Sequence, residues 1–383
     1  MKTINIILLV FLVCINLKCS RDNNVTKSDI VKINFEKYFN TKSRFNLSEI
    51  ADTIEYIKLN TPKDIIITSI CTIKIYDDNI FLTAKGQLYQ FLLDGTFVRK
   101  IGRKGRGPGE YLAVSHFFID TVKNEIGVSG VTALLFYSLD GTYLRQIKPL
   151  FGAIEKSDTV LWLCRIDNGI NKHKLFAFNE KGDTIGGVNN TEFYLYSNFF
   201  VSSKFTNPFY QFNDSLYFKG YENNDTIWEI KDLSVKPAFV IDMGQYKLPL
   251  RYRASYSKDN FLRFASHYYS IPRVMEDDRY IFLTVTPYLN NNYSFSLIVY
   301  DKSKKDGFVA EYNGAKGIYD DILKGPAFQP MSISDDYYIS CIEPDELLEQ
   351  CNLDLIKNED FKKILCDIDS CYNQLLVLCK KKI

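Results

Sequence analysis

The sequence predicts an all-β fold, a six-bladed β-propeller, from three observations. Residues 87–101 (QLYQFLLDGTFVRKI) alternate apolar and polar side chains around Asp94-Gly95, the pattern of two strands joined by a tight turn. The pattern recurs at 133–148 (ALLFYSLDGTYLRQIK) around Asp140-Gly141, and the 46 residues from Gly95 to Gly141 fit the repeat of a four-stranded blade. Aromatic residues make up 15% of the chain, which favours half-buried strands over helices.

Five internal sets of strands are expected between residues 69 and 312. In the first two sets, Asp and Gly turn residues separate four short alternating runs, and four consecutive strands make one blade. The third set is weaker, with three runs and its last turn at Lys181-Gly182. The expected strands are 69–76, 79–84, 87–92 and 96–101; 116–120, 125–128, 133–137 and 142–147; 159–165, 174–178 and 183–188; 209–212, 215–219, 226–230 and 238–242; and 269–275, 280–286, 294–301 and 308–312.

The two ends of the chain are expected to close the ring in a sixth blade. Each end has a strand-like run without a local partner, Ile54–Leu59 and Gln374–Cys379, and a third run covers Tyr337–Ile342. Pairing the N-terminal and C-terminal strands in the last blade removes two free strand edges. Before the final strand, apolar residues recur at helical spacing behind Asn358, a suitable N-cap, which predicts a short C-terminal helical insertion.

Residues 1–19 are predicted to be a signal peptide of the lipoprotein type. Lys2 precedes an apolar run at 6–15 that is shorter than a membrane span. Cys19 then stands where bacterial lipoproteins accept a diacylglyceryl group, although Asn16 and Lys18 replace the usual leucine and small residue. A soluble export signal and an uncleaved anchor are the alternatives to lipidation of Cys19. Residues 20–50 are expected to form a polar tether, and residues 51–383 the propeller.

Composition argues against two kinds of partner. Lys and Arg number 47 against 46 Asp and Glu, a net charge of +1, so no nucleic-acid partner is expected. The nine cysteines include no C-x-x-C pair, and the three histidines are scattered, so we expect no metal site and no cofactor. Five cysteines lie in the last 43 residues, where they are expected to be buried free thiols or to form a single disulfide.

The segment from Gly95 to Tyr111, GTFVRKIGRKGRGPGEY, resembles the NHL repeat. It is more closely similar to the bacterial 6-bladed β-propeller lipoprotein family, in which a G-R-x-G-x-G-P-G-E-Y segment is the hallmark. Asp225–Ile230 and Pro237–Gly244, followed by Leu248-Pro249, agree with that family as well. The resemblance extends over about residues 50–380. It implies an exported, lipid-tethered propeller and transfers no catalytic residue to this chain.

The glycine-rich loop at 101–111 has two interpretations. Glycines at 102, 105, 107 and 109 permit positive φ and close backbone approach, so an anion could bind among the amides beside Arg103 and Arg106. The loop is not a P-loop, because no Gly-Lys-Ser/Thr follows. The favoured interpretation is architectural: the glycines lead the chain from one blade to the next, and Glu110 or an arginine binds the neighbouring blade.

Three other residues are candidates for ligand binding. His116 lies on an expected innermost strand and would line the channel, more as a polar filler than as a base. Tyr252 and Tyr269 belong to a segment rich in Tyr and Arg, and aromatic rings stack on sugars or anchor protein interfaces. The alternative is that these rings cover the open face of the propeller itself.

We therefore expect a lipid-anchored protein of the bacterial cell envelope, on the outer or inner membrane and periplasmic or surface exposed. It would bind a glycan or a partner protein at one end of the ring. The alternative is a glycan lyase or hydrolase, which needs two carboxylates about 5–9.5 Å apart near His116, Tyr210 and Tyr269. Acidic pairs at 77–78, 277–278, 320–321 and 335–336 supply candidates, but solvated turns explain most of them. A third possibility, an envelope scaffold, would expose an apolar patch of several hundred Å².

Overall fold

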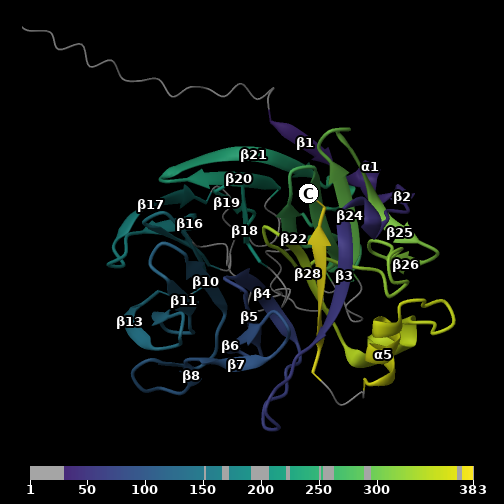
Figure 1. Cartoon of the computed structure of the whole chain (residues 1–383). Coiled ribbons are helices and arrows are strands. Elements are labelled where there is room, and N and C mark those ends of the chain that lie inside the picture. The colour runs from purple at the N-terminus through teal and green to yellow at the C-terminus, as the bar shows by residue number, and fades with distance from the viewer. Residues whose placement is uncertain are drawn as a thin grey trace, which may run out of the picture.

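Six β-sheets are arranged around a central axis, so the chain is a six-bladed β-propeller, as the sequence predicts (Figure 1). The computed structural model describes residues 30–150, 152–165, 172–190, 207–220, 225–249, 252, 263–288, 295–368 and 373–382. The innermost strands of several neighbouring blades contact one another, and each blade extends outward from its innermost strand.

The blades follow one another along the chain, and the strands of each blade run in order from the innermost outward. Blade 1 consists of β4 (Ile70–Tyr76), β5 (Asn79–Ala84), β6 (Gln87–Leu92) and β7 (Phe97–Ile101). Blade 2 consists of β10 (His116–Asp120), β11 (Glu125–Ser129), β12 (Leu134–Ser138) and β13 (Tyr143–Ile147). Blade 3 consists of β14 (Ala153–Ser157), β15 (Val160–Cys164), β16 (His173–Phe178) and β17 (Thr184–Asn189).

The second half of the ring repeats this order. Blade 4 consists of β18 (Phe209–Phe212), β19 (Ser215–Phe218), β20 (Thr226–Lys231) and β21 (Ser234–Asp242). Blade 5 consists of β22 (Tyr269–Glu276), β23 (Tyr280–Pro287), β24 (Ser296–Asp301) and β25 (Asp306–Tyr312), and β26 (Ala315–Lys316) pairs with β25. Blade 6 consists of β27 (Ser332–Ile333), β28 (Tyr337–Ile342), β29 (Leu375–Lys381) and β3 (Ala51–Lys58).

The turn before the outermost strand explains the sequence repeat. Gly95, Gly141 and Gly182 occupy equivalent places in blades 1, 2 and 3, with φ of +84°, +86° and +89°. Glycine adopts this conformation without the steric cost that a Cβ atom brings. The Asp94 and Asp140 carboxylates accept hydrogen bonds from the backbone two residues later, at 2.8 and 3.1 Å. The turn motif seen in the sequence therefore marks the same position in successive blades.

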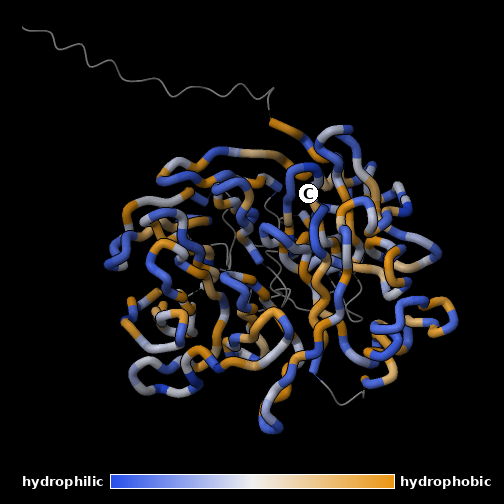
Figure 2. The backbone as a smooth tube through the Cα atoms, viewed as in Figure 1, coloured by the Kyte–Doolittle hydropathy of each residue, from blue (hydrophilic) through white to orange (hydrophobic). Residues whose placement is uncertain are grey.

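Among the described residues, six clusters of buried apolar side chains lie one between each pair of neighbouring blades, and a small seventh cluster joins Leu248, Ala265 and Tyr288. The cluster between blades 6 and 1 joins Ile339 and Leu378 to Ile73 and Phe91. Apolar residues recur along the strands of every blade in Figure 2. Burial of each such side chain stabilises the fold by about 1.5–3 kcal/mol, so the stability of the ring is shared among all six interfaces.

The ends of the chain close the ring in blade 6, as predicted. β29 lies between β28 and β3 and is antiparallel to both. Beyond the strands, the Asn373 side chain donates a hydrogen bond to the Leu59 carbonyl at 2.7 Å. The C-terminal insertion is helical, as expected, and contains α4 (Pro344–Gln350) and α5 (Glu359–Cys366). Asn358 caps α5 by accepting a hydrogen bond from the Phe361 amide at 2.8 Å.

The N-terminal segment differs from the sequence-based expectation, because residues 31–50 are folded onto the propeller rather than forming part of a tether. β1 (Val31–Asn34) adds to β21 of blade 4 as a parallel strand, and β2 (Lys42–Ser43) adds in the same way to β25 of blade 5. Between and after them lie α1 (Phe35–Phe39) and the 3-10 turn η1 (Leu47–Glu49). Ile33, Phe35 and Leu47 are fully buried. These few apolar residues anchor an otherwise polar segment, so the packed part of the chain extends before the boundary expected at residue 51.

The sequence also left out several short elements. β14 and β27, the innermost strands of blades 3 and 6, were not predicted, and neither were α4 and the 3-10 turn η2 (Gly244–Tyr246). β8 (Arg103–Lys104) and β9 (Glu110–Tyr111) pair within the glycine-rich loop. In the described part of the chain, Cys341, Cys351, Cys366 and Cys379 are free thiols. Within the same part of the chain, no helix has the length and apolar character needed to cross a membrane.

Candidate functional site

The glycine-rich loop is occupied by a carboxylate of its own. Glu110 accepts a hydrogen bond from Arg103 Nε at 2.6 Å and another from the Gly107 amide at 2.8 Å. These two hydrogen bonds hold the pKa of Glu110 below its usual value, and the bond from the Gly107 amide has the larger effect. The carboxylate thus takes the position that an external anion would need. Arg106 is exposed on the same loop.

Two buried tyrosines fix this loop between blades 1 and 2. The Tyr111 hydroxyl donates to the Ile101 carbonyl at 2.6 Å, and the Tyr137 hydroxyl donates to the Gly109 carbonyl at 2.9 Å. Burial raises the pKa of both hydroxyls. Gly109 has φ of +70°, and a Cβ atom there would lie 2.7 Å from the ring of Tyr143. These contacts support the architectural interpretation of the loop.

His116 belongs to a charged cluster in the inner wall of the ring. Its Nε2 lies 3.1 Å from Glu155 Oε1, and Lys74 Nζ binds the same oxygen. The three residues come from β10, β14 and β4, so the cluster joins the inner strands of blades 2, 3 and 1. Burial opposes ionisation of Glu155, but Lys74 and His116 outweigh it and lower its pKa. His116 therefore has a structural partner in Glu155, and its role as a polar filler stays a prediction.

Other buried acids of the ring also have partners. Glu276 accepts hydrogen bonds from Lys302 at 3.0 Å and from the Tyr210 hydroxyl at 2.9 Å. Burial nevertheless raises the pKa of Glu276. Asp301 pairs with Arg279 at 3.0 Å, so the two charges compensate each other.

Arg273 contrasts with these pairs. It lies on β22, the innermost strand of blade 5, and is only 7% exposed. Within the described ranges, its guanidinium forms no hydrogen bond, ion pair or ring contact with another side chain. Burial lowers its pKa to about 10, and the thiols of Cys341 and Cys71 oppose this shift electrostatically. A buried cation without a counter-ion is costly, which makes Arg273 the most unusual charge in the wall.

The inner wall beside Arg273 is affected by the shortness of the innermost strand of blade 6. Its innermost strand, β27, has two residues, whereas β22 and β4 on either side have eight and seven. β27 contacts both neighbours. The thiols near Arg273 come from β4 of blade 1 and β28 of blade 6. The guanidinium thus lies where three blades meet and where the inner wall is least complete.

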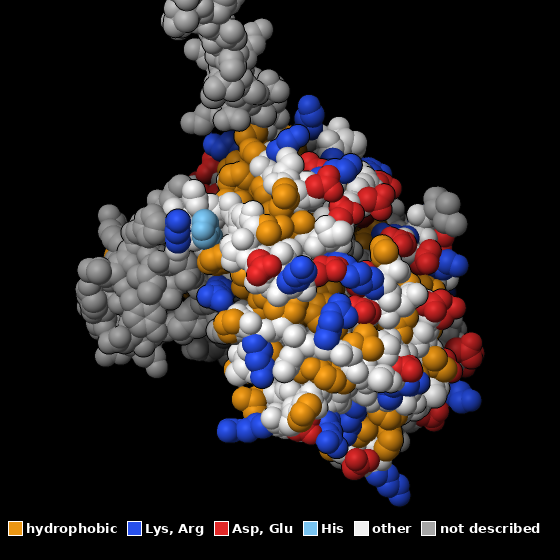
Figure 3. All heavy atoms as spheres, turned by 90° about the vertical axis from the view of Figure 1, so that its left-hand side faces the viewer, with side chains coloured by type: hydrophobic (Ala, Val, Ile, Leu, Met, Phe, Trp, Pro, Cys, Tyr) orange, Lys and Arg blue, Asp and Glu red, His pale blue; other side chains and the backbone are white. Residues whose placement is uncertain are grey.

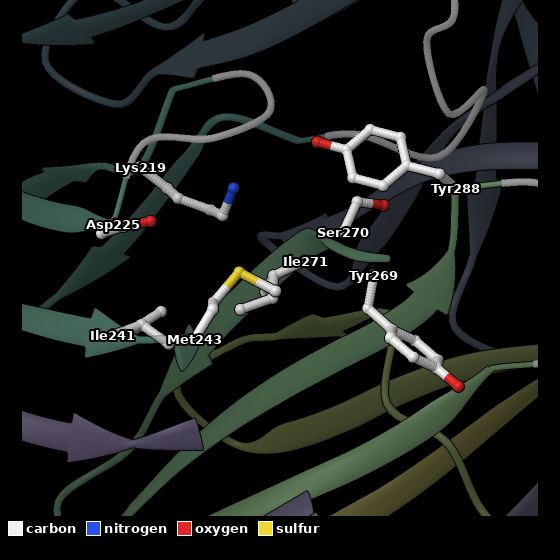
Figure 4. Close-up of a pocket in the computed structure, with 8 residues that line it drawn as sticks. All are labelled: Lys219, Asp225, Ile241, Met243, Tyr269, Ser270, Ile271 and Tyr288. Carbon is white, nitrogen blue, oxygen red and sulfur yellow. The ribbon is translucent and has the colours of Figure 1, made fainter. Parts of the chain in front are cut away.

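The two candidate tyrosines face their own protein. Tyr252 stacks on Phe264, with ring centroids 4.4 Å apart, and Tyr269 packs against Phe39 at 4.7 Å and Tyr246 at 5.6 Å. Tyr269 also borders a cavity of about 10 Å³ between blades 4 and 5, enough for about one water molecule. Figure 4 shows the Tyr269 ring directed away from this cavity, while Lys219 and the Tyr288 hydroxyl are directed toward it.

The candidate residues therefore lie in three places. Arg103 and Arg106 are in the loop between blades 1 and 2, His116 is in the inner wall, and Tyr252 and Tyr269 accompany blade 5. Cys19 lies outside the described residues. On the face in Figure 3, basic and acidic side chains are interspersed rather than separated into fields of one sign.

Sequence reasoning missed Lys74, Glu155 and Arg273. The available signal was a charged residue inside a run expected to be an innermost strand, as in ICTIKIY for Lys74 and IPRVM for Arg273. Glu155 could not be found in this way because β14 itself was not predicted.

Comparison with known families identifies the family of this chain. The family model described as "Domain of unknown function (DUF4934)" matches residues 30–380. The chain belongs to the DUF4934 family. The match begins at β1, in agreement with the inclusion of residues 31–50 in the DUF4934 fold. No curated protein matches the chain.

Two solved structures share the propeller fold of this DUF4934 chain. A protein from Bacteroides fragilis NCTC 9343, described as exported, is 18% identical with a TM-score of 0.70, covering 92% of this chain and 100% of that one. A member of the duf4221 family from Bacteroides vulgatus ATCC 8482 is 14% identical with a TM-score of 0.52, covering 86% and 97%. The six-bladed propeller expected from the resemblance is confirmed, whereas its NHL-like and lipoprotein aspects remain predictions.

Proposed function

We propose that this protein is an exported, lipid-tethered binding module whose ligand presents an anionic group to Arg273 in the inner wall of the ring. The contrast between Arg273 and the paired acids Glu155, Glu276 and Asp301 carries the proposal. A bound carboxylate would offset the cost of burying the guanidinium and could accept two parallel hydrogen bonds from it. Such a bond pair also orients the ligand, which supports a binding function.

The carboxylate could come from a glycan or from a protein, the two ligand classes expected from the sequence. Uronic acids and acidic side chains present the same group to an arginine. The position of Arg273 beside the two-residue strand β27 favours a ligand that enters the ring along its axis. The test must therefore include both sources.

Thermal unfolding in the presence of anions tests this proposal. Glucuronate, oligogalacturonate and a glutamate-containing peptide serve as probes, and a ligand of the folded state raises Tm with its concentration. We expect one probe to raise the Tm of the wild type but not that of Arg273→Met. Arg279→Met is the matched control, because Arg279 already has Asp301 as its partner, and this variant should keep the response.

The same experiment has an outcome that does not depend on finding the natural ligand. Without any anion, Arg273→Met should be at least as stable as the wild type, because methionine is uncharged and fills similar space. A marked loss of stability in this variant, together with a wild-type Tm that responds to none of the probes, would overturn the anion site.

The lipid tether is a separate part of the proposal and rests on Cys19. The apolar run before Cys19 supports export, and the thiol would receive the lipid. A Cys19→Ala variant should leave the membrane fraction. Unchanged partitioning would refute the tether without affecting the anion site.

A glycan-cleaving enzyme remains the alternative, and Glu276 is the residue that favours it. Burial raises the pKa of this carboxyl, as a general acid requires. Both of its oxygens are engaged, one by Lys302 and one by Tyr210. Release of reducing ends from an acidic polysaccharide, abolished by Glu276→Gln, would replace the binding proposal with this one.

A further inference from the structure

A groove between blades 3 and 4 has a lining unlike the rest of the surface. It encloses about 470 Å³ and is bordered by Trp162 and Trp228, by apolar or glycine residues of β17, by Leu233 and by Val235 of β21. The chain has two tryptophans, and both line this groove. The volume lies within the range of small-ligand and side-chain pockets.

The two indole N–H groups are the unusual polar feature of the groove. Trp162 is 1% exposed and Trp228 is half-buried, yet neither Nε1 atom has a hydrogen-bond partner among the described residues. A buried donor without an acceptor costs about 1–3 kcal/mol. Both Nε1 atoms lie below the surface, so an occupant of the groove would contact the indole rings.

The groove exists because small residues lie beside Trp162. Across blade 3, Trp162 is in register with Ala177, and Ala177 is in register with Gly186 on the outermost strand. A Cβ atom at Gly186 would have Ala177 Cβ as its nearest neighbour, at 3.9 Å. A larger side chain could thus be placed at Gly186 without collision near the backbone.

Among the described residues, the edge of blade 3 is also more open than the edges of blades 1, 2, 4 and 5. The outer strands of blades 4 and 5 are paired with β1 and β2. The outer strands of blades 1 and 2 carry Lys100 and Arg145, and charges on an edge discourage pairing with another strand. On β17, Ile185, Gly186 and Gly187 are exposed and uncharged.

We infer that the groove and the β17 edge bind an extended, uncharged peptide segment of a partner protein. The peptide adds to β17 as a further strand of blade 3 and places an apolar side chain between the tryptophans. The strand edge supplies the backbone pairing, and the two indole rings supply apolar contact to that side chain. The addition of β1 to blade 4 shows the same mode of pairing inside this chain. This site is separate from Arg273 and does not depend on the proposed anion ligand.

A peptide library and tryptophan fluorescence test the inference. A phage-displayed library of decapeptides is selected on the full chain, and the selected peptide is titrated while tryptophan emission is recorded. Because both tryptophans line the groove, a change in emission reports on this site directly. We expect uncharged peptides rich in β-branched residues, and binding at least tenfold weaker in Gly186→Leu with an unchanged Tm. Trp228→Ala, which removes one aromatic wall of the groove, should weaken binding about threefold to tenfold.

Occupants other than an uncharged peptide would give different experimental results. Selection of no peptide, selection of charged peptides, or binding that Gly186→Leu does not change would overturn the inference. A change in emission with neutral oligosaccharides such as cellohexaose would assign the groove to glycans. Self-association by sedimentation that Gly186→Leu abolishes would assign it to a second copy of the chain.

Discussion

The charged cluster in the inner wall allows a prediction whose magnitude follows from its burial. Substitution of Glu155→Gln leaves Lys74 and His116 without their carboxylate. The side chains of Glu155 and His116 are 4% and 5% exposed, whereas that of Lys74 is 24% exposed and keeps some contact with water. Breaking a buried ion pair costs about 3–5 kcal/mol, and the partial exposure of Lys74 places the expected loss near 3 kcal/mol at pH 7.

The pH dependence provides a second readout of the same substitution. The pKa of Glu155 is lower in the folded state than its ordinary value of 4.5. Its contribution is therefore fully present well above pH 4.5 and is lost as the pH falls through the folded-state pKa. Urea unfolding at several pH values should show the difference between wild type and Glu155→Gln shrinking in acid.

An exposed ion pair serves as the control for this experiment. Lys37 and Asp306 lie 2.8 Å apart with side chains 58% and 56% exposed, so water and salt screen the pair. Asp306→Asn should change stability far less than Glu155→Gln. A loss below about 1 kcal/mol for Glu155→Gln at pH 7, or a loss that is the same at pH 7 and pH 3, would refute the reasoning.

Two further predictions concern the glycine-rich loop and the N-terminal segment, and urea unfolding measures both. Gly109→Ala should cost about 3 kcal/mol, because its φ of +70° is strained for other residues and the new Cβ would collide with Tyr143. Gly107→Ala should cost less than about 1 kcal/mol because its φ is ordinary; equal losses would contradict the architectural account. Phe35→Ala should cost about 3–5 kcal/mol because Phe35 is fully buried, whereas Val31→Ala, at a residue 44% exposed, should cost little. A neutral Phe35→Ala would mean that residues 31–50 are not part of the cooperative fold.

Much of the ring could be predicted from the sequence because the turns of blades 1 and 2 contain a recognisable Asp-Gly motif. Asp94-Gly95 and Asp140-Gly141 stand between alternating runs, and the structure gives both glycines the same conformation. The elements that were missed have weak patterns. β14 (AIEKS) mixes charges with its apolar residues, β27 has two residues, and β1 (VKIN) is polar on one side and buried through Ile33 on the other.

The candidate site was less predictable than the fold because it depends on contacts between blades. Lys74 and Glu155 are 81 residues apart in the chain, and no local pattern indicates that they meet. Arg273 is unusual because its guanidinium has no charged partner among the described residues, and the lack of a partner cannot be read from a sequence. The groove at Trp162 depends in the same way on the small residue Gly186 two strands away.

The order in which blade 6 is assembled has a consequence for biosynthesis. β3 is among the first strands to leave the ribosome, but its partner β29 ends one residue before the last described residue, Lys382. Asn373 and Leu59, which meet at this seam, are 314 residues apart. Until β29 has been translated, β3 presents an open edge that other chains could pair with. A chaperone that keeps the nascent chain unfolded would protect this edge. A chain truncated just before β29 could not close the ring, because β3 would lack its partner strand.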